Sequence, residues 1–172
     1  MNDVKVYHVN ENLPVFVSYI DFSPTEIETL KKKILEYRKK NPKSNVSNVK
    51  AWHSAYKTYF KDEAFDFYIK VIKKEVEDIT NKFYKFENKI KLYDMWINMY
   101  EKADHAILHS HWPSCYSCCF YIDVDENCSS IKFPPQLEII PKNNMLVVFR
   151  GETLHEVNST DGKRTLFAMN FD

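Results

Sequence analysis

The spacing of apolar residues changes near residue 90. Before that point, Ile27, Leu30 and Ile34 recur every three or four positions. A second series has the same spacing at Phe65, Tyr68, Ile72, Val76, Ile79 and Phe83. After residue 90, apolar residues mostly alternate with polar ones over short stretches. Spacings of three and four predict helices with one apolar face, and alternation predicts strands. The chain is therefore expected to be helical first and strand-rich afterwards.

The first helix has a clear start in the sequence. Ser23 is expected to be its N-cap, Pro24 its first helical residue and Glu26 its third, which completes a capping box. The polar segment 39–45, KKNPKSN, is expected to end it. The second helix is expected to begin near Asp62 and to pack its apolar stripe against a sheet, with Lys and Glu facing solvent.

One strand is expected at residues 14–20 and about eight more after residue 90. The later segments are 90–101, 106–112, 116–124, 130–133, 136–140, 144–150, 153–157 and 164–171. Because the chain has only 2 glycines, residues such as Asn143 and Asn144 must form the tight turns, and Asn tolerates the left-handed conformation. Many short strands predict a mainly β fold of the α+β class, an antiparallel jelly roll or barrel with the N-terminal helices packed on one sheet.

Length and charge narrow the class of protein. The 172 residues suit one domain spanning 1–172, with a helical support region at 1–89 and a jelly-roll core at 90–172. Lys plus Arg and Asp plus Glu are both 24, which argues against a nucleic-acid partner. The first residues lack the features of a signal peptide, and no apolar run is long enough for a membrane span. Four cysteines at 115–128, two of them adjacent, suit no disulfide framework, so a reducing, cytoplasmic location is expected.

Three histidines form a candidate metal site. His109 and His111 are two apart on a predicted strand, so both can face the same side, and His155 lies on a later strand. Imidazole is a common ligand for iron, zinc, copper and nickel. The H-x-H pair alone is a weak signal, because such pairs are often ordinary surface or core histidines.

Arg164 strengthens that signal. It stands early in the last predicted strand and shares a side with Leu166, Ala168 and Asn170. An arginine that points into a small barrel is unfavourable unless it meets an anion, and its planar fork suits a carboxylate. The alternative is an ordinary ion pair with a structural Asp or Glu.

The segment DMWINMYE also has two different faces. Trp96, Asn98 and Tyr100 share one side of the predicted strand, and Met95, Ile97 and Met99 share the other. The second set suits packing against the helices. The first set suits either the orientation of a small polar ligand or core packing with ordinary hydrogen bonds.

Three segments together resemble the non-haem iron, 2-oxoglutarate-dependent oxygenase superfamily in its H-x-H form. They are WINMYEKADHAILHSHWPSCYSCCFYIDV, IIPKNNMLVVFRGETLHEV and KRTLFAMNF, and the resemblance covers residues 90–172 motif by motif. It implies a double-stranded β-helix, the jelly roll also found in cupins, that holds Fe(II) and uses 2-oxoglutarate as co-substrate. The implied activity is a dioxygenase that hydroxylates its substrate and releases succinate and CO2.

The same resemblance implies roles for individual residues. His109, His111 and His155 fall on the metal-ligand positions, and Arg164 falls on the position that pairs with the distal carboxylate of 2-oxoglutarate. Asn98, Tyr100 and Asn170 match further positions that contact 2-oxoglutarate. Trp112 and Tyr116, close after His111, are expected to line the mouth of the pocket. The substrate is expected to be a small molecule or a protein side chain, and the oligomeric state, a dimer included, stays open.

His111 departs from most of the superfamily, which has Asp or Glu at that position. Three neutral imidazoles would leave Fe(II) with its full charge of +2 instead of the +1 that a bound carboxylate leaves. That difference is expected to alter the affinity for the metal and its redox tuning, and it makes zinc harder to exclude.

Three other interpretations remain open. A structural zinc site could use Cys115 and Cys118, but these face opposite sides of a strand and no second C-x-x-C follows. A cupin-type metal dioxygenase or isomerase would usually have a Glu after the second histidine, where this chain has Cys115 and Tyr116. The third is a catalytically inactive jelly-roll binding module, against which the inward Arg164 argues.

Overall fold

The computed structural model describes residues 3–45, 47–58, 62–85, 87 and 89–172. Its helices are α1 (Pro24–Lys40), the short 3₁₀ helix η2 (Glu63–Phe65) and α2 (Asp66–Tyr84). Its strands are β1 (Lys5–His8), β2 (Pro14–Tyr19), β3 (Val49–Lys50), β4 (Trp52–His53), β5 (Leu92–Tyr100), β6 (His105–His109), β7 (Tyr116–Val124), β8 (Ile131–Phe133), β9 (Leu137–Ile139), β10 (Met145–Arg150), β11 (His155–Val157) and β12 (Arg164–Phe171).

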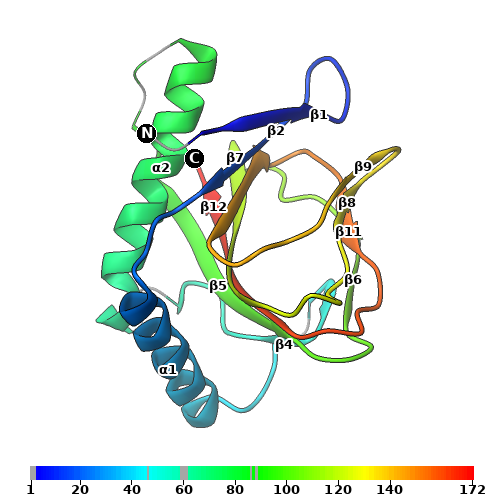
Figure 1. Ribbon diagram of the computed structural model, residues 1–172. Coiled ribbons are helices and arrows are strands. Elements are labelled where there is room, and N and C mark those ends of the chain that lie inside the picture. The colour runs from blue at the N-terminus through cyan, green and yellow to red at the C-terminus, as the bar shows by residue number, and fades with distance from the viewer. Residues whose placement is uncertain (1–2, 46, 59–61, 86, 88) are drawn as a thin grey trace.

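The strands form two sheets that face each other. The larger sheet has the order β1-β2-β10-β7-β12-β5-β4, and the smaller has the order β3-β6-β11-β8-β9. All the strand pairs in the described residues are antiparallel. Figure 1 shows the two sheets curving round a common interior, with both helices outside the larger sheet. The predicted jelly roll with helices on one face is therefore confirmed.

Alternation along β5 divides the core into two layers. Met95 and Ile97 pack in the cluster that joins the larger sheet to α1 and α2. Trp96 and Tyr100 belong to the second cluster, which fills the space between the two sheets. Successive side chains of a strand point to opposite faces, so one strand supplies both layers. The predicted two-faced character of this segment is confirmed.

The first helix begins as the sequence predicts. Pro24 is the first residue of α1, the Ser23 hydroxyl accepts a hydrogen bond from the Glu26 amide at 3.3 Å, and the Glu26 carboxylate accepts from the Ser23 amide at 2.7 Å. The second helix differs slightly from its prediction. Asp62 caps η2 and the α-helix follows at Asp66.

One residue of the predicted apolar stripe is not buried. Phe83 is 40% exposed near the end of α2, where its ring packs edge-on against Phe16 at 4.9 Å between ring centroids. The fully buried part of the stripe therefore ends at Ile79, and Phe16 of the larger sheet covers Phe83 only in part.

The first 89 residues are more than a helical support. β1, β3 and β4 were not predicted, and β3 and β4 have two residues each, too few to show a period. β4 pairs with β5, with His53 opposite Asn98. This pairing brings a residue of the first half beside the interior of the barrel.

The expected left-handed turn is confirmed at Asn144, whose φ is 64°.

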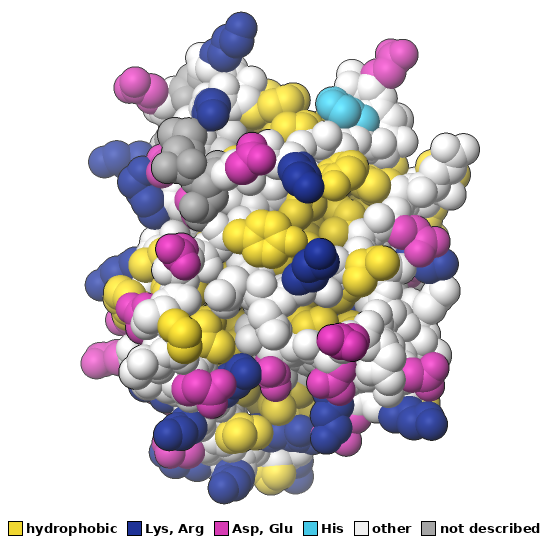
Figure 2. Space-filling view, viewed as in Figure 1, with side chains coloured by type: hydrophobic (Ala, Val, Ile, Leu, Met, Phe, Trp, Pro, Cys, Tyr) yellow, Lys and Arg dark blue, Asp and Glu magenta, His cyan; other side chains and the backbone are white. Residues whose placement is uncertain are grey.

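Charged side chains of both signs lie around the helices and along the lower edge of the face in Figure 2, whereas apolar side chains gather over its strand-rich part. Within the described residues, neither the length nor the apolar character of any helix is sufficient for a membrane crossing.

Candidate metal centre

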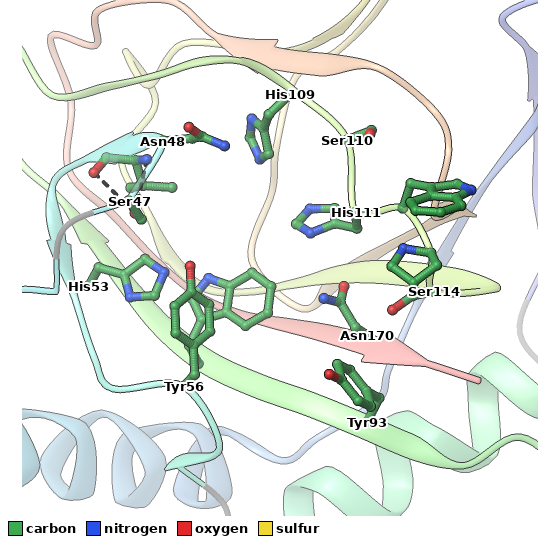
Figure 3. A pocket seen from close by; sticks show the side chains of 14 residues that line it. Ser47, Asn48, His53, Tyr56, Tyr93, His109, Ser110, His111, Ser114 and Asn170 are labelled. Atoms are coloured by element: carbon green, nitrogen blue, oxygen red, sulfur yellow. Dashed lines mark hydrogen bonds between the residues drawn. The ribbon is translucent and has the colours of Figure 1, made fainter.

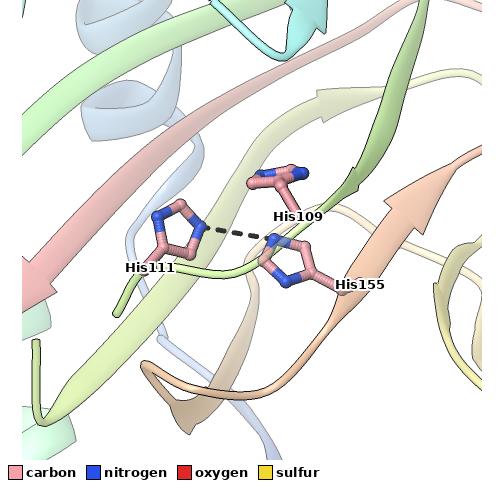
Figure 4. A group of neighbouring side chains, drawn as sticks. All are labelled: His109, His111 and His155. Atoms are coloured by element: carbon pink, nitrogen blue, oxygen red, sulfur yellow. Dashed lines mark hydrogen bonds between the residues drawn. The ribbon is translucent and has the colours of Figure 1, made fainter. Parts of the chain in front are cut away.

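The three predicted histidines converge in the interior of the barrel. The antiparallel pairing of β6 and β11 sets His109 directly opposite His155, and their ring centroids are 4.3 Å apart. The His111 ring centroid lies 5.0 Å from that of His155 and 5.2 Å from that of His109. Figure 4 shows all three rings turned toward a common point. Within the described chain, this is the group of His, Cys, Asp or Glu side chains that could hold a metal ion.

His111 does not lie on the strand where the sequence predicts it. β6 ends at His109, and His111 belongs to the loop that follows. Backbone hydrogen bonds fix that loop: the His111 amide donates to the Gly151 carbonyl at 2.7 Å, and the Gly151 amide donates to the Cys115 carbonyl at 3.1 Å. Strand alternation therefore orients His109, whereas contact with Gly151 orients His111.

Hydrogen bonds at Nδ1 leave Nε2 of His109 and Nε2 of His155 free to bind a cation. Nδ1 of His109 lies 2.6 Å from the Ile107 carbonyl, and Nδ1 of His155 lies 3.1 Å from the Thr153 carbonyl. A carbonyl can only accept, so each Nδ1 carries the proton and each Nε2 keeps its lone pair.

Burial also keeps the three rings neutral. It lowers the pKa of His109, lowers that of His111 to about 3, and brings that of His155 well below its usual value. The neighbouring histidines lower the last two further. Neutral imidazole is the form that binds metals.

The nitrogens need to move little to share one ion. Nε2 of His111 and Nε2 of His155 are 3.3 Å apart, and the candidate ligand atoms of all three residues lie within 4.8 Å of one another. A metal–nitrogen distance of about 2.1 Å implies separations of roughly 3 Å between ligands on one ion. The donor set and its spacing fit a divalent metal after a small closure of the group.

Arg164 is buried without an ionic partner. It is 1% exposed, its Nη1 donates to the Ser129 carbonyl at 2.9 Å, and its guanidinium carbon lies 4.2 Å from the centroid of the Tyr100 ring. Its Nε and Nη2 have no hydrogen-bond partner. Among the residues described, no carboxylate pairs with it, so the alternative of a structural ion pair is excluded for that part of the chain.

Arg164 and the histidines line the same inner cavity. Asn98 and Tyr100 also line it, and the buried Asn98 Oδ1 and Trp96 Nε1 lack partners as well. Burial raises the pKa of Tyr100 to about 12, so its hydroxyl keeps its proton and can donate. The unpartnered Nε and Nη2 of Arg164 are donors opposite a metal-binding group, which suits a ligand with a carboxylate at its far end, whereas Asn98 Oδ1 can only accept. The cavity measures about 30 Å³, room for one or two water molecules, so its walls must move apart when such a ligand enters.

A second, outer hollow of about 200 Å³ opens on the other side of the histidines. His109 and His111 form part of its wall, together with Trp112 and Asn170 (Figure 3). Asn170 lies on β12 about 20 Å along the strand from Arg164, and its Oδ1 accepts a hydrogen bond from the Ser117 hydroxyl at 2.8 Å. Its assignment to 2-oxoglutarate stays a prediction, and its position is beside the metal group.

Tyr116 does not line this hollow. It packs against the helix-side cluster, and it lines a separate hollow with Arg150 and Thr80. The prediction for Tyr116 is wrong in this respect, because even-numbered residues of β7 face the helices and odd-numbered ones face the barrel.

The cysteines take no part in the candidate metal group. Cys118, Cys119 and Cys128 are buried, whereas Cys115 is exposed. None of the four belongs to the group of possible ligands in the described chain. Nothing in the described residues therefore supports the structural zinc site as an alternative.

Sequence reasoning missed His53 and Tyr56, which also line the outer hollow. The His53 ring stacks on Trp96 with centroids 5.6 Å apart and an angle of 11°, and Tyr56 packs edge-on against both. His53 is buried, its Nδ1 lies 2.5 Å from the Ser54 carbonyl, and burial lowers its pKa. The strand that carries His53 is two residues long, so no periodicity could have revealed its position.

Comparison with known proteins supports the fold. No protein-family model and no curated protein sequence matches the chain. Solved structures do match. The carbocyclase SnoK from nogalamycin biosynthesis, described as non-heme and alpha-ketoglutarate-dependent, gives a TM-score of 0.69 at 12% identity, over 91% of this chain and 78% of that one. A viral collagen prolyl hydroxylase from Paramecium bursaria Chlorella virus-1, in its 2OG complex, gives 0.65 at 17% identity, over 90% and 94%.

A third similar structure contains a peptide. It is a prolyl hydroxylase from Trichoplax adhaerens in complex with a peptide fragment of a hypoxia-inducible factor, with a TM-score of 0.65 at 13% identity, over 92% of this chain and 83% of that one. At these identities the similarity establishes a common fold, the jelly roll of 2-oxoglutarate oxygenases.

Proposed function

We propose that this chain is an Fe(II)- and 2-oxoglutarate-dependent oxygenase that hydroxylates its substrate. The observation that carries the proposal is the inner cavity, which joins three neutral imidazoles to a buried arginine with two unpartnered nitrogens. A barrel core without a ligand would gain nothing from an uncompensated guanidinium, because burying an unpaired charge is unfavourable. This argues against the inactive binding module.

Each end of the cavity has its own task in this proposal. His109, His111 and His155 hold Fe(II) through Nε2, and the carbonyls at Ile107 and Thr153 keep two of those rings in the right tautomer. Arg164 binds the distal carboxylate of 2-oxoglutarate, and Tyr100 holds the guanidinium in place from one side.

When bound, Fe(II) with 2-oxoglutarate supplies an oxidation in which one atom of O2 enters succinate, released with CO2, and the other enters a C–H bond of the substrate. The chain's own contribution is to bind and orient the reactants and to exclude water. The apolar side chains between the two sheets, among them Leu166, Ala168 and Val157, surround the inner cavity and perform that exclusion.

The similar folds support oxygenase chemistry and leave the substrate open. Of the three similar structures named above, two are prolyl hydroxylases and one is a carbocyclase of nogalamycin biosynthesis, so this fold serves both peptide and small-molecule chemistry. The lining of this chain's own outer hollow therefore decides which class of substrate it accepts.

The proposal is tested by adding Fe(II) and then 2-oxoglutarate to the protein without oxygen. We expect a visible charge-transfer band from iron chelated by 2-oxoglutarate. The band should disappear in His155→Ala, which loses a metal ligand, and should persist in Lys74→Ala, an exposed change on the outer helix. A protein that gives no band and is purified with one equivalent of zinc would refute the proposal.

A further inference from the structure

The outer hollow indicates the class of substrate. This inference rests on the proposed function. His109 and His111 form its inner wall, so a group inside it lies next to the metal. Its volume of about 200 Å³ is below the roughly 300–1,000 Å³ of typical small-molecule pockets. The space therefore fits one side chain or a fragment of similar size.

The wall of the hollow is uncharged. Within the part of the chain that the structure describes, no Asp, Glu, Lys or Arg lines it, although 28% of the residues are charged. One carboxylate of the co-substrate offsets part of the charge of the metal, and the other pairs with Arg164. A charged side chain would lose its hydration in the hollow without gaining an ionic partner among the described lining residues, so the hollow selects an uncharged group.

Aromatic rings and a few polar groups shape the interior. Trp96 and His53 form a parallel stack, and Tyr56 packs edge-on against it (Figure 3). Because the Nδ1 proton of His53 faces the Ser54 carbonyl, Nε2 is the ring atom free to accept a hydrogen bond. The amide nitrogen of Asn170 can donate, since its oxygen accepts from Ser117. The interior therefore suits an apolar group flanked by amide-like donors and acceptors.

The rim of the hollow extends beyond what a small molecule inside it could touch. Trp112 is 76% exposed, Tyr93 is 52% exposed and Tyr56 is 46% exposed. Exposed Trp and Tyr around a pocket are typical of surfaces that bind a macromolecule. Nucleic acid is disfavoured, because its phosphates require several Lys or Arg. None of the described lining residues supplies one, and Lys57, over the Tyr93 ring at 5.5 Å from its centroid, brings a single positive charge to the rim.

We propose that the substrate is a polypeptide segment that lies across the aromatic rim formed by Tyr56, Tyr93 and Trp112 and inserts one uncharged side chain into the outer hollow. The inserted side chain faces the metal group, and His53 and Asn170 hydrogen-bond to the peptide groups beside it. His53 acts as a positioning residue, since it neither holds the metal nor meets the co-substrate end of the inner cavity.

The test uses a degenerate library of acetylated and amidated peptides. The central residue is fixed in turn as Pro, Leu, Glu or Lys, and the protein is immobilised without oxygen with Fe(II) and 2-oxoglutarate. We expect it to retain peptides with central Pro or Leu and to reject those with Glu or Lys. Admitting air should then add the mass of one oxygen atom to the retained peptides. Blocked single amino acids with the same side chains should bind at least about tenfold more weakly, because they cannot reach the rim.

Variants separate the rim from the metal group. Trp112→Ala should weaken peptide binding about tenfold and leave the charge-transfer band unchanged, because this side chain is exposed at the rim. Tyr7→Ala, an equally drastic change at an exposed tyrosine on β1, should alter neither. His53→Gln should retain more peptide affinity than His53→Ala, since glutamine can still accept a hydrogen bond.

Three outcomes would overturn the inference while the band still forms. They are retention of no peptide, equal affinity for blocked single amino acids, and binding of a single-stranded oligonucleotide that depends on Trp112. Absence of the band itself would instead count against the proposed function, so the two failures are distinguishable.

Discussion

Arg164 is the residue whose burial is hardest to explain by stability. Its guanidinium has one strong hydrogen bond, to the Ser129 carbonyl, and two nitrogens with no partner. A buried charge that lacks compensation destabilises a fold, and apolar residues of similar size are often neutral or better at such positions. Arg164 is therefore expected to serve binding at the expense of stability.

Replacing Arg164 by Met tests that expectation. We expect Arg164→Met to be as stable as the native protein or more stable by about 1 kcal/mol, measured by urea unfolding. Its affinity for 2-oxoglutarate in calorimetry should fall about a hundredfold, since losing one partner of a buried charge pair removes about 2–5 kcal/mol of binding free energy. Metal binding should persist. Lys39→Met, an exposed change near the end of α1, serves as the control. Lower stability with unchanged affinity would identify Arg164 as structural.

The loop between β6 and β7 decides where His111 points, and Gly151 after β10 holds that loop. A Cβ on Gly151 would lie 1.9 Å from the Ser114 carbonyl oxygen, so no larger residue fits without moving the loop. Gly151 also exchanges backbone hydrogen bonds with His111 and Cys115. The reason for glycine here is close approach between two backbones, since its φ is not positive.

We expect Gly151→Ala to displace this loop and to weaken metal binding. The loss of metal affinity should exceed that of a control variant with a similar loss of stability. Overpacking of this kind destabilises by about 1–3 kcal/mol, which urea unfolding measures. Gly162→Ala is the matched control, because its Cβ would meet the Asn127 side chain and the adjacent backbone, none of which belongs to the metal group. If both variants lose stability and neither loses metal affinity, measured with Co(II), Gly151 does not position His111.

Burial inside the barrel lowers the pKa of its histidines, so the fold as a whole determines their protonation. Burial between the sheets lowers the pKa of His109, His111, His155 and His53 together. An unfolded chain regains the usual histidine pKa of about 6.5. Below that pH the unfolded state therefore binds more protons than the folded state, so the free energy of unfolding falls as the pH falls.

We expect the metal-free protein to lose stability steadily between about pH 7 and pH 5.5. His111→Asn should make that slope shallower, because the folded pKa of His111 is about 3, so its stabilising contribution declines from about pH 6.5 toward pH 3 and falls through this range. Urea unfolding at several pH values measures both slopes. Parallel curves for His111→Asn and the native protein would contradict the expectation.

The sequence alone was sufficient to predict features that depend on the spacing of apolar residues and on the chemistry of a few neighbouring residues. The capping box at Ser23, the alternating faces of β5 and the left-handed turn at Asn144 all follow from a few neighbouring residues. The order of motifs from Asn98 to Arg164 also indicated the jelly roll and its group of three histidines. The first three signals are short-range in the chain or repeat with a fixed spacing, whereas the last rests on the resemblance of three separate segments to a known superfamily.

The tertiary structure decided what depends on contacts between distant segments. His53 enters the outer hollow because β4 pairs with β5, and His111 is oriented by Gly151 from forty residues away. Tyr116 meets the helices because α1 and α2 cover the face of the larger sheet to which the even-numbered residues of β7 point. Only the positions of all the neighbouring groups show that Nε and Nη2 of Arg164 have no hydrogen-bond partner. The local sequence determines which side chains share one face of a strand. The pairing of the strands determines which other parts of the chain that face contacts.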